Sequence, residues 1–296
     1  MEGPEIGFIG LGKMGIPMVR NLLRGGFEIR GFDLDPDAAK ALADEKGFTA
    51  VSSPQQAAQD ARMVILMLPD SNIVDRLLWL DGGGLVASLK RGAILIDMGS
   101  SDPVRSRENS SKLGVKGLGF IDAPVSGGVK RAIDGSLSIM IGGEPDAVKQ
   151  AFPIFEAMGK TLVHVGSAGS GHAVKALNNY VSASGLVAVC EALVAAEKFG
   201  IDPHLVNQVF NASSGKNNTT EHKVESFMLS GTYSSGFAMS LMRKDLQTAR
   251  DFIQRMGTPA DFVGHCLKTW TDAESGLGKG ADHTAMFDFL QVKSEV

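Results

Sequence analysis

The sequence predicts an α/β domain followed by an all-α domain. Three observations support this prediction. A glycine-rich turn directly follows the first apolar strand, short apolar strands recur up to about residue 165, and helical patterns without strands follow from about residue 166. We therefore place the domains at residues 1–165 and 166–296, with a long helix at about residues 170–199 joining them.

The composition excludes several classes of protein. The chain has 296 residues, of which 44% are hydrophobic and 21% charged, and its net charge of −4 leaves no positive surplus for nucleic acid. Cys190 and Cys266 lie far apart, which indicates a reducing compartment and no disulfide framework. We see neither a secretory leader nor a transit segment, and apolar runs are interrupted before they reach the length of a membrane span. We therefore expect a cytoplasmic protein whose partners include neither nucleic acid nor a membrane.

The beginning of the chain has the order strand, glycine motif, helix, strand and acidic residue. The strands are predicted at residues 5–9 and 28–32, the helix at residues 16–24, and Asp33 closes the second strand. The glycine motif reads Gly10-Leu11-Gly12-Lys13-Met14-Gly15. In this context a G-x-G-x-x-G motif predicts a Rossmann-type dinucleotide-binding domain.

Each glycine of the motif has a physical role in binding a dinucleotide. Gly10 permits the tight turn, Gly12 lets the backbone approach a pyrophosphate, and Gly15 lets the helix pack closely on the strand. The helix start offers free N–H groups to the phosphates. Asp33 can accept both ribose hydroxyls and would repel a 2′-phosphate, and no arginine follows it, so we expect NAD(H), with NADP(H) disfavoured.

The alternation continues with strands at residues 63–68 and 93–96, and a helix begins at about residue 72. Open α/β sheets bind ligands along the carboxyl ends of their strands. Leu68, Pro69 and Ser100 follow these strands and are therefore candidates to line the cofactor site. The alternative is that they are ordinary loop residues.

A further strand at residues 119–125 is followed by Ser126, Gly127 and Gly128. Consecutive N–H groups in such a small, flexible loop can bind an anion, which makes these residues candidates to hold a substrate carboxylate. The alternative is an ordinary hairpin turn, because a strand at residues 136–141 follows soon after. A last strand at residues 161–165 closes the domain.

The long helix carries apolar residues nearly all round, so we expect most of it to be buried. Against this background Lys175, Asn178, Asn179 and Ser182 form one polar stripe at helical spacing. Burial would lower the pKa of Lys175 toward the range in which a lysine exchanges protons. The alternative is a lysine that extends to solvent beside two hydrogen-bonded core asparagines.

The second domain is predicted to contain helices at residues 203–211, 219–228, 245–256 and 259–274. Lys244 would then lie at a helix start, where the dipole disfavours a cation, and this hints at an external anionic partner. A solvated surface lysine is the alternative. The histidines show no spacing typical of metal ligands, so no metal is expected.

Five motifs occur along the chain in a fixed order, at residues 7–15, 67–69, 122–128, 171–179 and 244–246. With these motifs the chain resembles the β-hydroxyacid dehydrogenase family, which includes 3-hydroxyisobutyrate dehydrogenases, tartronate semialdehyde reductases and 2-(hydroxymethyl)glutarate dehydrogenases. The similarity covers almost the whole length. The motifs are specific for the family and do not identify the substrate.

The resemblance implies roles for individual residues. Lys175 resembles the catalytic lysine, a general acid in reduction and a base in oxidation, while Asn179 orients the substrate and Asn178 lies close by. The loop of Ser126, Gly127 and Gly128 is expected to hold the carboxylate, and Ser100 and Lys244 to contact the cofactor region. The resemblance also implies an all-helical second domain for substrate binding and oligomerisation, and because exposed faces of such domains commonly pair, we expect a homodimer or homotetramer.

The resemblance also leaves choices open. Gly99 stands where many members carry Ser or Thr, and Lys130-Arg131 is more basic than in several members, so either residue could favour a substrate with a second anionic group or several hydroxyls. A solvated charge pair is the alternative. We expect a hydroxyacid dehydrogenase; the rivals are a tartronate or succinic semialdehyde reductase working mainly toward the alcohol, and a non-catalytic nucleotide sensor on the same fold.

Overall fold

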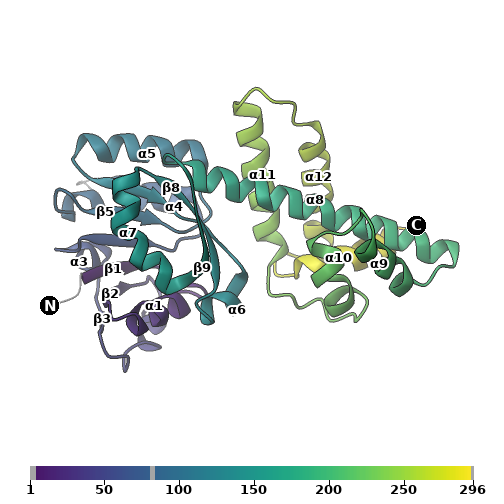
Figure 1. The fold of residues 1–296 in the computed structure, drawn as a ribbon, viewed down its shortest axis with the longest axis horizontal. Helices are drawn as coiled ribbons and strands as arrows, with labels where there is room; N and C mark the ends of the chain where they lie inside the picture. The colour runs from purple at the N-terminus through teal and green to yellow at the C-terminus, as the bar shows by residue number, and fades with distance from the viewer. Residues whose placement is uncertain (1–4, 81–83, 295–296) are drawn as a thin grey trace. The chain divides into compact units, whose positions relative to one another are not determined.

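The computed structural model describes residues 5–80 and 84–294. The chain divides into two compact units, Met1–Lys175 and Ala176–Val296, called unit 1 and unit 2 below. Helix α8 (Ser170–Phe199) contains the division point, so it contributes its first residues to unit 1 and the remainder to unit 2 (Figure 1).

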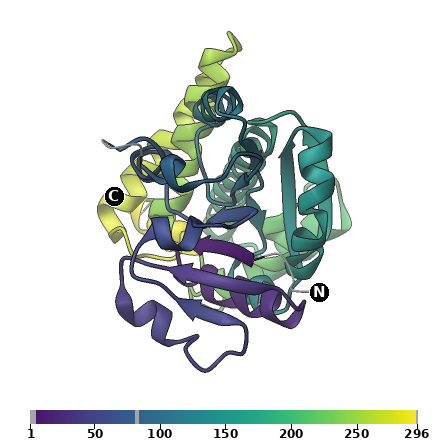
Figure 2. The same ribbon diagram turned by 90° about the vertical axis from the view of Figure 1, so that its left-hand side faces the viewer.

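Unit 1 is built on one sheet with the strand order β3-β2-β1-β4-β5-β6-β8-β7, and β9 pairs with β8. Strands β1 to β6 are parallel, and the amino-terminal strands lie side by side in Figure 2. The chain order reverses between β1 and β4, which is where Rossmann-type sheets bind their dinucleotide. The strands are β1 (Glu5–Ile9), β2 (Glu28–Phe32), β3 (Phe48–Ala50), β4 (Met63–Leu66), β5 (Ile94–Asp97), β6 (Gly119–Asp122), β7 (Val125–Ser126), β8 (Leu137–Gly143) and β9 (Gly159–Gly166).

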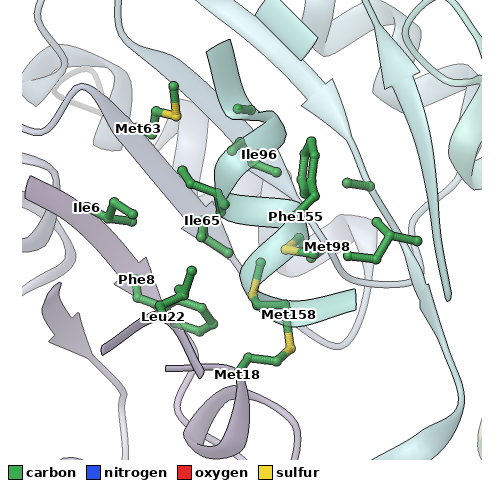
Figure 3. Close-up of a cluster of buried hydrophobic side chains, with 14 of the residues drawn as sticks. Ile6, Phe8, Met18, Leu22, Met63, Ile65, Ile96, Met98, Phe155 and Met158 are labelled. Carbon is green, nitrogen blue, oxygen red and sulfur yellow. The ribbon is translucent and has the colours of Figure 1, made fainter. Parts of the chain in front are cut away.

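Helices cover both faces of this sheet, because alternate residues of its strands point to opposite sides. In β4, Met63 and Ile65 face one core, where Met18 and Phe155 pack against them (Figure 3). The intervening Val64 and Leu66 face the other core. The first core contains residues of α1 (Gly15–Arg24), α6 (Gly128–Ile133) and α7 (Pro145–Met158), and the second contains residues of α3 (Pro54–Ala58), α4 (Ser71–Trp79) and α5 (Pro103–Val115). The short helix α2 (Pro36–Lys40) follows β2.

Two predicted strands are shorter than expected. The strand predicted at residues 63–68 ends at Leu66, so Leu68 and Pro69 lie in the loop beyond it. The strand predicted at residues 119–125 is interrupted, and β6 and β7 pair with β8 on either side of Ala123-Pro124. Pro124 has no N–H to donate to the ladder, which accounts for the break. An ordinary hairpin turn after Ser126 is the alternative interpretation of this stretch. The connection between β7 and β8 instead contains helix α6, so it is not a tight turn.

Unit 2 contains helices, and its described residues include no strand longer than an isolated bridge between Ala238 and Asp282. Its core surrounds Trp270, which is fully buried. Besides α8 the elements are α9 (Pro203–Ala212), α10 (Asn218–His222), a π-helix (Val224–Met228), α11 (Met239–Arg255), α12 (Asp261–Leu277), a 3₁₀ turn (His283–Ala285) and α13 (Met286–Lys293).

One prediction for unit 2 is wrong. Helix α11 begins at Met239, so Lys244 lies in its second turn and not at its start. The dipole argument for Lys244 therefore fails, because the field of a helix end acts mainly within the first turn.

Helix α8 is less completely buried than its apolar composition suggests. Val181 is 69% exposed and Val174 is 37% exposed, so the helix has one open face, while Leu186 and Leu193 are fully buried in the unit 2 core. By length and composition alone α8 is long and apolar enough to cross a membrane. Core helices meet the same criteria, and the buried residues of α8 identify it as one.

Candidate functional site

The glycine loop between β1 and α1 has the geometry that a bound dinucleotide requires. Gly10 has φ of +103°, and a Cβ on it would lie 2.3 Å from the Met67 carbonyl oxygen. A Cβ on Gly15 would lie 2.0 Å from the Gly10 carbonyl oxygen. Gly12, in contrast, is exposed and faces open space, with no atom within 4 Å of an added Cβ. The first and third glycines thus serve packing, and the second leaves room for a ligand.

Asp33 is held against this loop. Its Oδ2 accepts a hydrogen bond from the Leu11 N–H at 2.6 Å, and its Oδ1 accepts one from the Asp35 N–H at 2.8 Å. Each carboxylate oxygen keeps a lone pair for a further donor such as a ribose hydroxyl. The carboxylate is therefore oriented and still able to bind, and the residues of this loop fit a dinucleotide. Between Gly12 and Gly15, the Lys13 side chain is exposed and the Met14 side chain is half-buried.

The loop after β4 meets the glycine loop, and the loop after β5 meets the loop after β4. The Leu68 Cδ2 atom lies 3.3 Å from the position of a Cβ on Gly10. A Cβ on Gly99 would lie 2.4 Å from the Leu68 carbonyl oxygen, so in this chain glycine at 99 permits a close approach of two loops. Asp97 shapes the second loop by accepting hydrogen bonds from the Gly99 N–H (3.0 Å) and the Ser101 hydroxyl (2.7 Å), with half-buried Ser100 between them.

The loop after β7 has an unusual backbone. Gly127 and Gly128 have φ of +125° and +66°, and they lead into α6. A Cβ on Gly127 would lie 2.3 Å from the Arg131 Cδ atom, so the Arg131 side chain lies over this glycine. Lys130 and Arg131 are both exposed. Ser126 is half-buried at the end of β7. The loop can present N–H groups to an anion, with a guanidinium beside it.

Lys175 is a buried lysine, 9% exposed, in the second turn of α8. The first turn of this helix is held by Asp122, at the end of β6, whose Oδ1 and Oδ2 accept hydrogen bonds from the Gly169 N–H (2.7 Å) and the His172 N–H (2.8 Å). Burial raises the pKa of the Asp122 carboxyl above its ordinary value, while the nearby His172 ring and these N–H groups oppose the rise. Sequence reasoning assigned no role to Asp122 or His172, although both lie inside the stretches that carry the family resemblance.

In unit 2, Asn179 is buried and its Nδ2 donates a hydrogen bond to Asp245 Oδ2 at 2.6 Å. The other oxygen, Asp245 Oδ1, lies 3.2 Å from the Lys244 Nζ. Asn178 is exposed, and its Nδ2 donates to Asn179 Oδ1 at 3.2 Å. In the predicted polar stripe, Asn179 is therefore buried and oriented by the Asp245 carboxylate, whereas Asn178 is exposed. Sequence reasoning placed Asp245 only at the start of the predicted helix at residues 245–256 and missed this role.

Metal chemistry has no support in the described part of the chain. No group of three or more His, Cys, Asp or Glu side chains there could hold a metal ion. Cys190 and Cys266 are both buried free thiols, and burial raises the pKa of each. Neither is therefore prepared to act as a thiolate.

Two family models match the chain. Residues 5–166 match the NAD-binding domain of 6-phosphogluconate dehydrogenase, and residues 169–290 match a model described as the NAD-binding domain of NADP-dependent 3-hydroxyisobutyrate dehydrogenase. Together the two matches span nearly all of both units.

Named relatives cover the same length. The 2-(hydroxymethyl)glutarate dehydrogenase of Eubacterium barkeri is 37% identical, over 93% of this chain and 91% of the relative. The 2-hydroxy-3-oxopropionate reductase of Escherichia coli is 32% identical, over 97% of both chains. Among solved structures, the 3-hydroxyisobutyrate dehydrogenase of Mycobacterium tuberculosis with L-serine has a TM-score of 0.90 at 32% identity, over 98% of this chain and 99% of that one.

Proposed function

The chain belongs to the β-hydroxyacid dehydrogenase family, and we propose that it interconverts a small β-hydroxyacid and its semialdehyde or ketone with NAD(H) as cofactor. The observation that supports this most is the buried Lys175, placed one turn beyond a helix start that is tied to the strand ends of the nucleotide-binding unit. Burying an ammonium costs free energy and favours the neutral amine, which is the form that can take a proton from a hydroxyl.

The names of the relatives narrow the substrate class. The 2-(hydroxymethyl)glutarate and the L-serine named with two of them both carry a primary hydroxyl on the carbon next to the one that bears the carboxylate. The 2-hydroxy-3-oxopropionate named with a third has an aldehyde at that position. We propose a substrate of this type for the present chain, with a hydroxymethyl or secondary β-hydroxyl as the oxidisable group.

The proposed roles follow from the chemistry of oxidation. The bound dinucleotide supplies the hydride acceptor for the alcohol carbon. Lys175 takes the hydroxyl proton as general base, and in reduction its ammonium returns a proton to the carbonyl oxygen. Asn179 orients the hydroxyl, with Asn178 beside it. Ser126, Gly127 and Gly128 hold the carboxylate through their N–H and hydroxyl groups.

The proposed cofactor residues are those of the glycine loop, namely Gly10, Leu11, Gly12, Lys13, Met14 and Gly15, together with Asp33, Leu68, Pro69, Ser100 and Lys244. The preference for NAD over NADP rests on Asp33, whose oriented carboxylate would repel a 2′-phosphate. Because one matching family model is described as NADP-dependent, the two cofactors have to be compared directly.

Two alternative functions are weighed against this proposal, and an oligomeric state is proposed with it. The Escherichia coli relative, named a reductase, favours a semialdehyde reductase as the second candidate. A nucleotide sensor without catalysis is disfavoured, because both the glycine motif and the lysine are present. We further propose a homodimer or homotetramer, because unit 2 exposes large apolar side chains such as Leu205, Val209 and Phe262.

The test compares wild type with Lys175→Ala on a panel containing 3-hydroxyisobutyrate, L-serine, glycerate, 4-hydroxybutyrate and threonate, followed as NADH formation at 340 nm, with NADP in parallel. We expect turnover of one substrate class with NAD preferred, and a fall in kcat of about 10²- to 10⁴-fold in the variant. NADH binding, measured by fluorescence, should be unchanged. Lys198→Ala, at the exposed end of the same helix, is the matched control and should keep wild-type turnover. Equal turnover in wild type and Lys175→Ala would contradict the assignment.

A further inference from the structure

The start of α8 is fastened to the sheet by its backbone. One carboxylate, that of Asp122, accepts the N–H groups of both Gly169 and His172. These N–H groups belong to the helix start, where the backbone has no partners within the helix. Asp122 is fully buried, so the two hydrogen bonds form away from solvent, where they are strong.

Two glycines allow this close contact. A Cβ on Gly171, in the first turn of α8, would lie 2.4 Å from the Met140 carbonyl oxygen and 2.7 Å from the Asp122 carbonyl oxygen. A Cβ on Gly142, in β8, would lie 2.5 Å from Asp122 Oδ1. The helix start therefore rests directly on the backbone of β6 and β8, with no side chain in between. A contact made by backbone atoms leaves the helix little freedom to shift.

The same cluster reaches the loop that carries Ser100. Asp97 and Asp122 are register partners at the ends of β5 and β6, and both are buried. The buried His172 ring lies between them, with Nε2 3.9 Å from Asp97 Oδ2 and Nδ1 3.7 Å from Asp122 Oδ2. His172 Nδ1 also shares a hydrogen bond with the Ser106 hydroxyl at 2.7 Å. Asp97 in turn holds the Gly99 N–H and the Ser101 hydroxyl.

We propose that Asp122, His172 and Asp97 form a positioning cluster for Lys175, and this inference rests on the proposed function. Lys175 follows His172 by three residues on the same helix, so a shift of the first turn moves its amine directly. Because Asp97 and Asp122 are register partners and the Ala123 N–H donates to the Asp97 carbonyl oxygen at 2.7 Å, the cluster also sets that amine in register with the loop of Ser100, which is proposed to contact the cofactor. Proton and hydride transfer both act on one alcohol group, so the two supports must keep a common geometry.

The variant Asp122→Asn tests this cluster. An asparagine has one acceptor oxygen, so it can hold only one of the two helix N–H groups, and its own amide would face the other. We expect kcat to fall on the order of 10- to 100-fold, because a shift of about 1 Å has effects of this size. The KM of the hydroxyacid and the Kd of NADH should stay within about threefold of wild type, since no substrate or cofactor contact is removed. Rates are expressed per NADH-binding site.

The matched control is Asp202→Asn. Asp202 also caps a helix, accepting the His204 N–H at 2.9 Å at the start of α9, a helix of unit 2, whereas Lys175 belongs to unit 1. Its kcat should be unchanged even if its melting temperature falls. His172→Ala is a second variant at the cluster, with kcat expected about tenfold lower; His172→Gln, whose amide can still bond Ser106, should recover most of it. This pair carries the test if Asp122→Asn does not fold.

A double-mutant cycle decides between positioning and general stability. If Asp122 acts through Lys175, the variant Asp122→Asn/Lys175→Ala has the same residual single-turnover rate as Lys175→Ala. Additive losses, or a loss of folded protein with unchanged kcat per NADH site, would overturn the positioning role while leaving the proposed function intact. Full activity of Lys175→Ala alone would instead overturn the proposed function.

Discussion

Asp122 and Asp245 are both buried carboxylates that contact α8, one in each unit, and they hold it in different ways. Asp122 accepts backbone N–H groups and so holds the helix itself. Asp245 accepts the side-chain amide of Asn179 at 2.6 Å and so holds a single rotatable group. The first arrangement controls where a helix begins, and the second controls how one amide points.

This difference predicts different kinetic consequences. A misplaced helix start displaces Lys175 in the next turn, while the Asn179 amide is still held by Asp245, so the change should appear in kcat. A misdirected amide changes how a substrate is held and should appear mainly in KM. The following predictions test the contrast.

Among the residues that hold the substrate or its binding groups, the largest effect is expected at Asp245→Ala. Removing the carboxylate leaves the buried amide of Asn179 without its acceptor and removes the oxygen near the Lys244 Nζ. Two groups proposed to bind ligands lose their carboxylate partner together, and a hydrogen bond of this kind is worth about 1–3 kcal/mol, so we expect the KM of the hydroxyacid to rise on the order of 10- to 100-fold while kcat changes less. Steady-state kinetics at saturating NAD measures both constants. A fall in kcat with unchanged KM, as proposed for Asp122→Asn, would break the comparison.

A smaller effect is expected from Asn179→Ala, about tenfold in KM, because one oriented hydrogen-bonding group is lost. Asn178→Ala is the comparison on the same helix, since Asn178 is proposed to lie beside the substrate without orienting its hydroxyl. Its side chain is exposed, so its KM should stay within about twofold of wild type. Equal effects at the two positions would show that burial and the Asp245 contact do not distinguish them.

The smallest effect is expected from exposed charges beside the carboxylate loop. In Arg131→Ala the guanidinium over Gly127 is lost, and we expect the KM of substrates with a second anionic group to rise about two- to fivefold, since exposed ion pairs are weak. The same KM measurement on Lys130→Ala shows whether the exposed charge next to Arg131 has a similar effect. The effect should shrink at high salt. An equal change for substrates with one and with two carboxylates would remove Arg131 as a specificity residue.

Local patterns predicted much of unit 1. The strand, glycine motif and acidic residue around Gly12 and Asp33 depend on neighbours within about thirty residues, so their geometry could be anticipated. The start of α11 could not be anticipated from the sequence. Ala238, its N-cap, makes no side-chain cap hydrogen bond, so no start signal precedes Met239, and Asp245 resembled a first-turn residue instead. The six-residue helix α6 is too short to show a period.

The sequence by itself determined the fold class, the dinucleotide loop, the extent of α8 and the presence of Lys175 and Asn179 on it. Only the tertiary structure decided which groups hold these side chains. Asp122 meets His172, and Asn179 meets Asp245, across separations of 50 and 66 residues. Such pairs depend on strand register and helix packing, which bring distant residues together, and no local period or spacing encodes them.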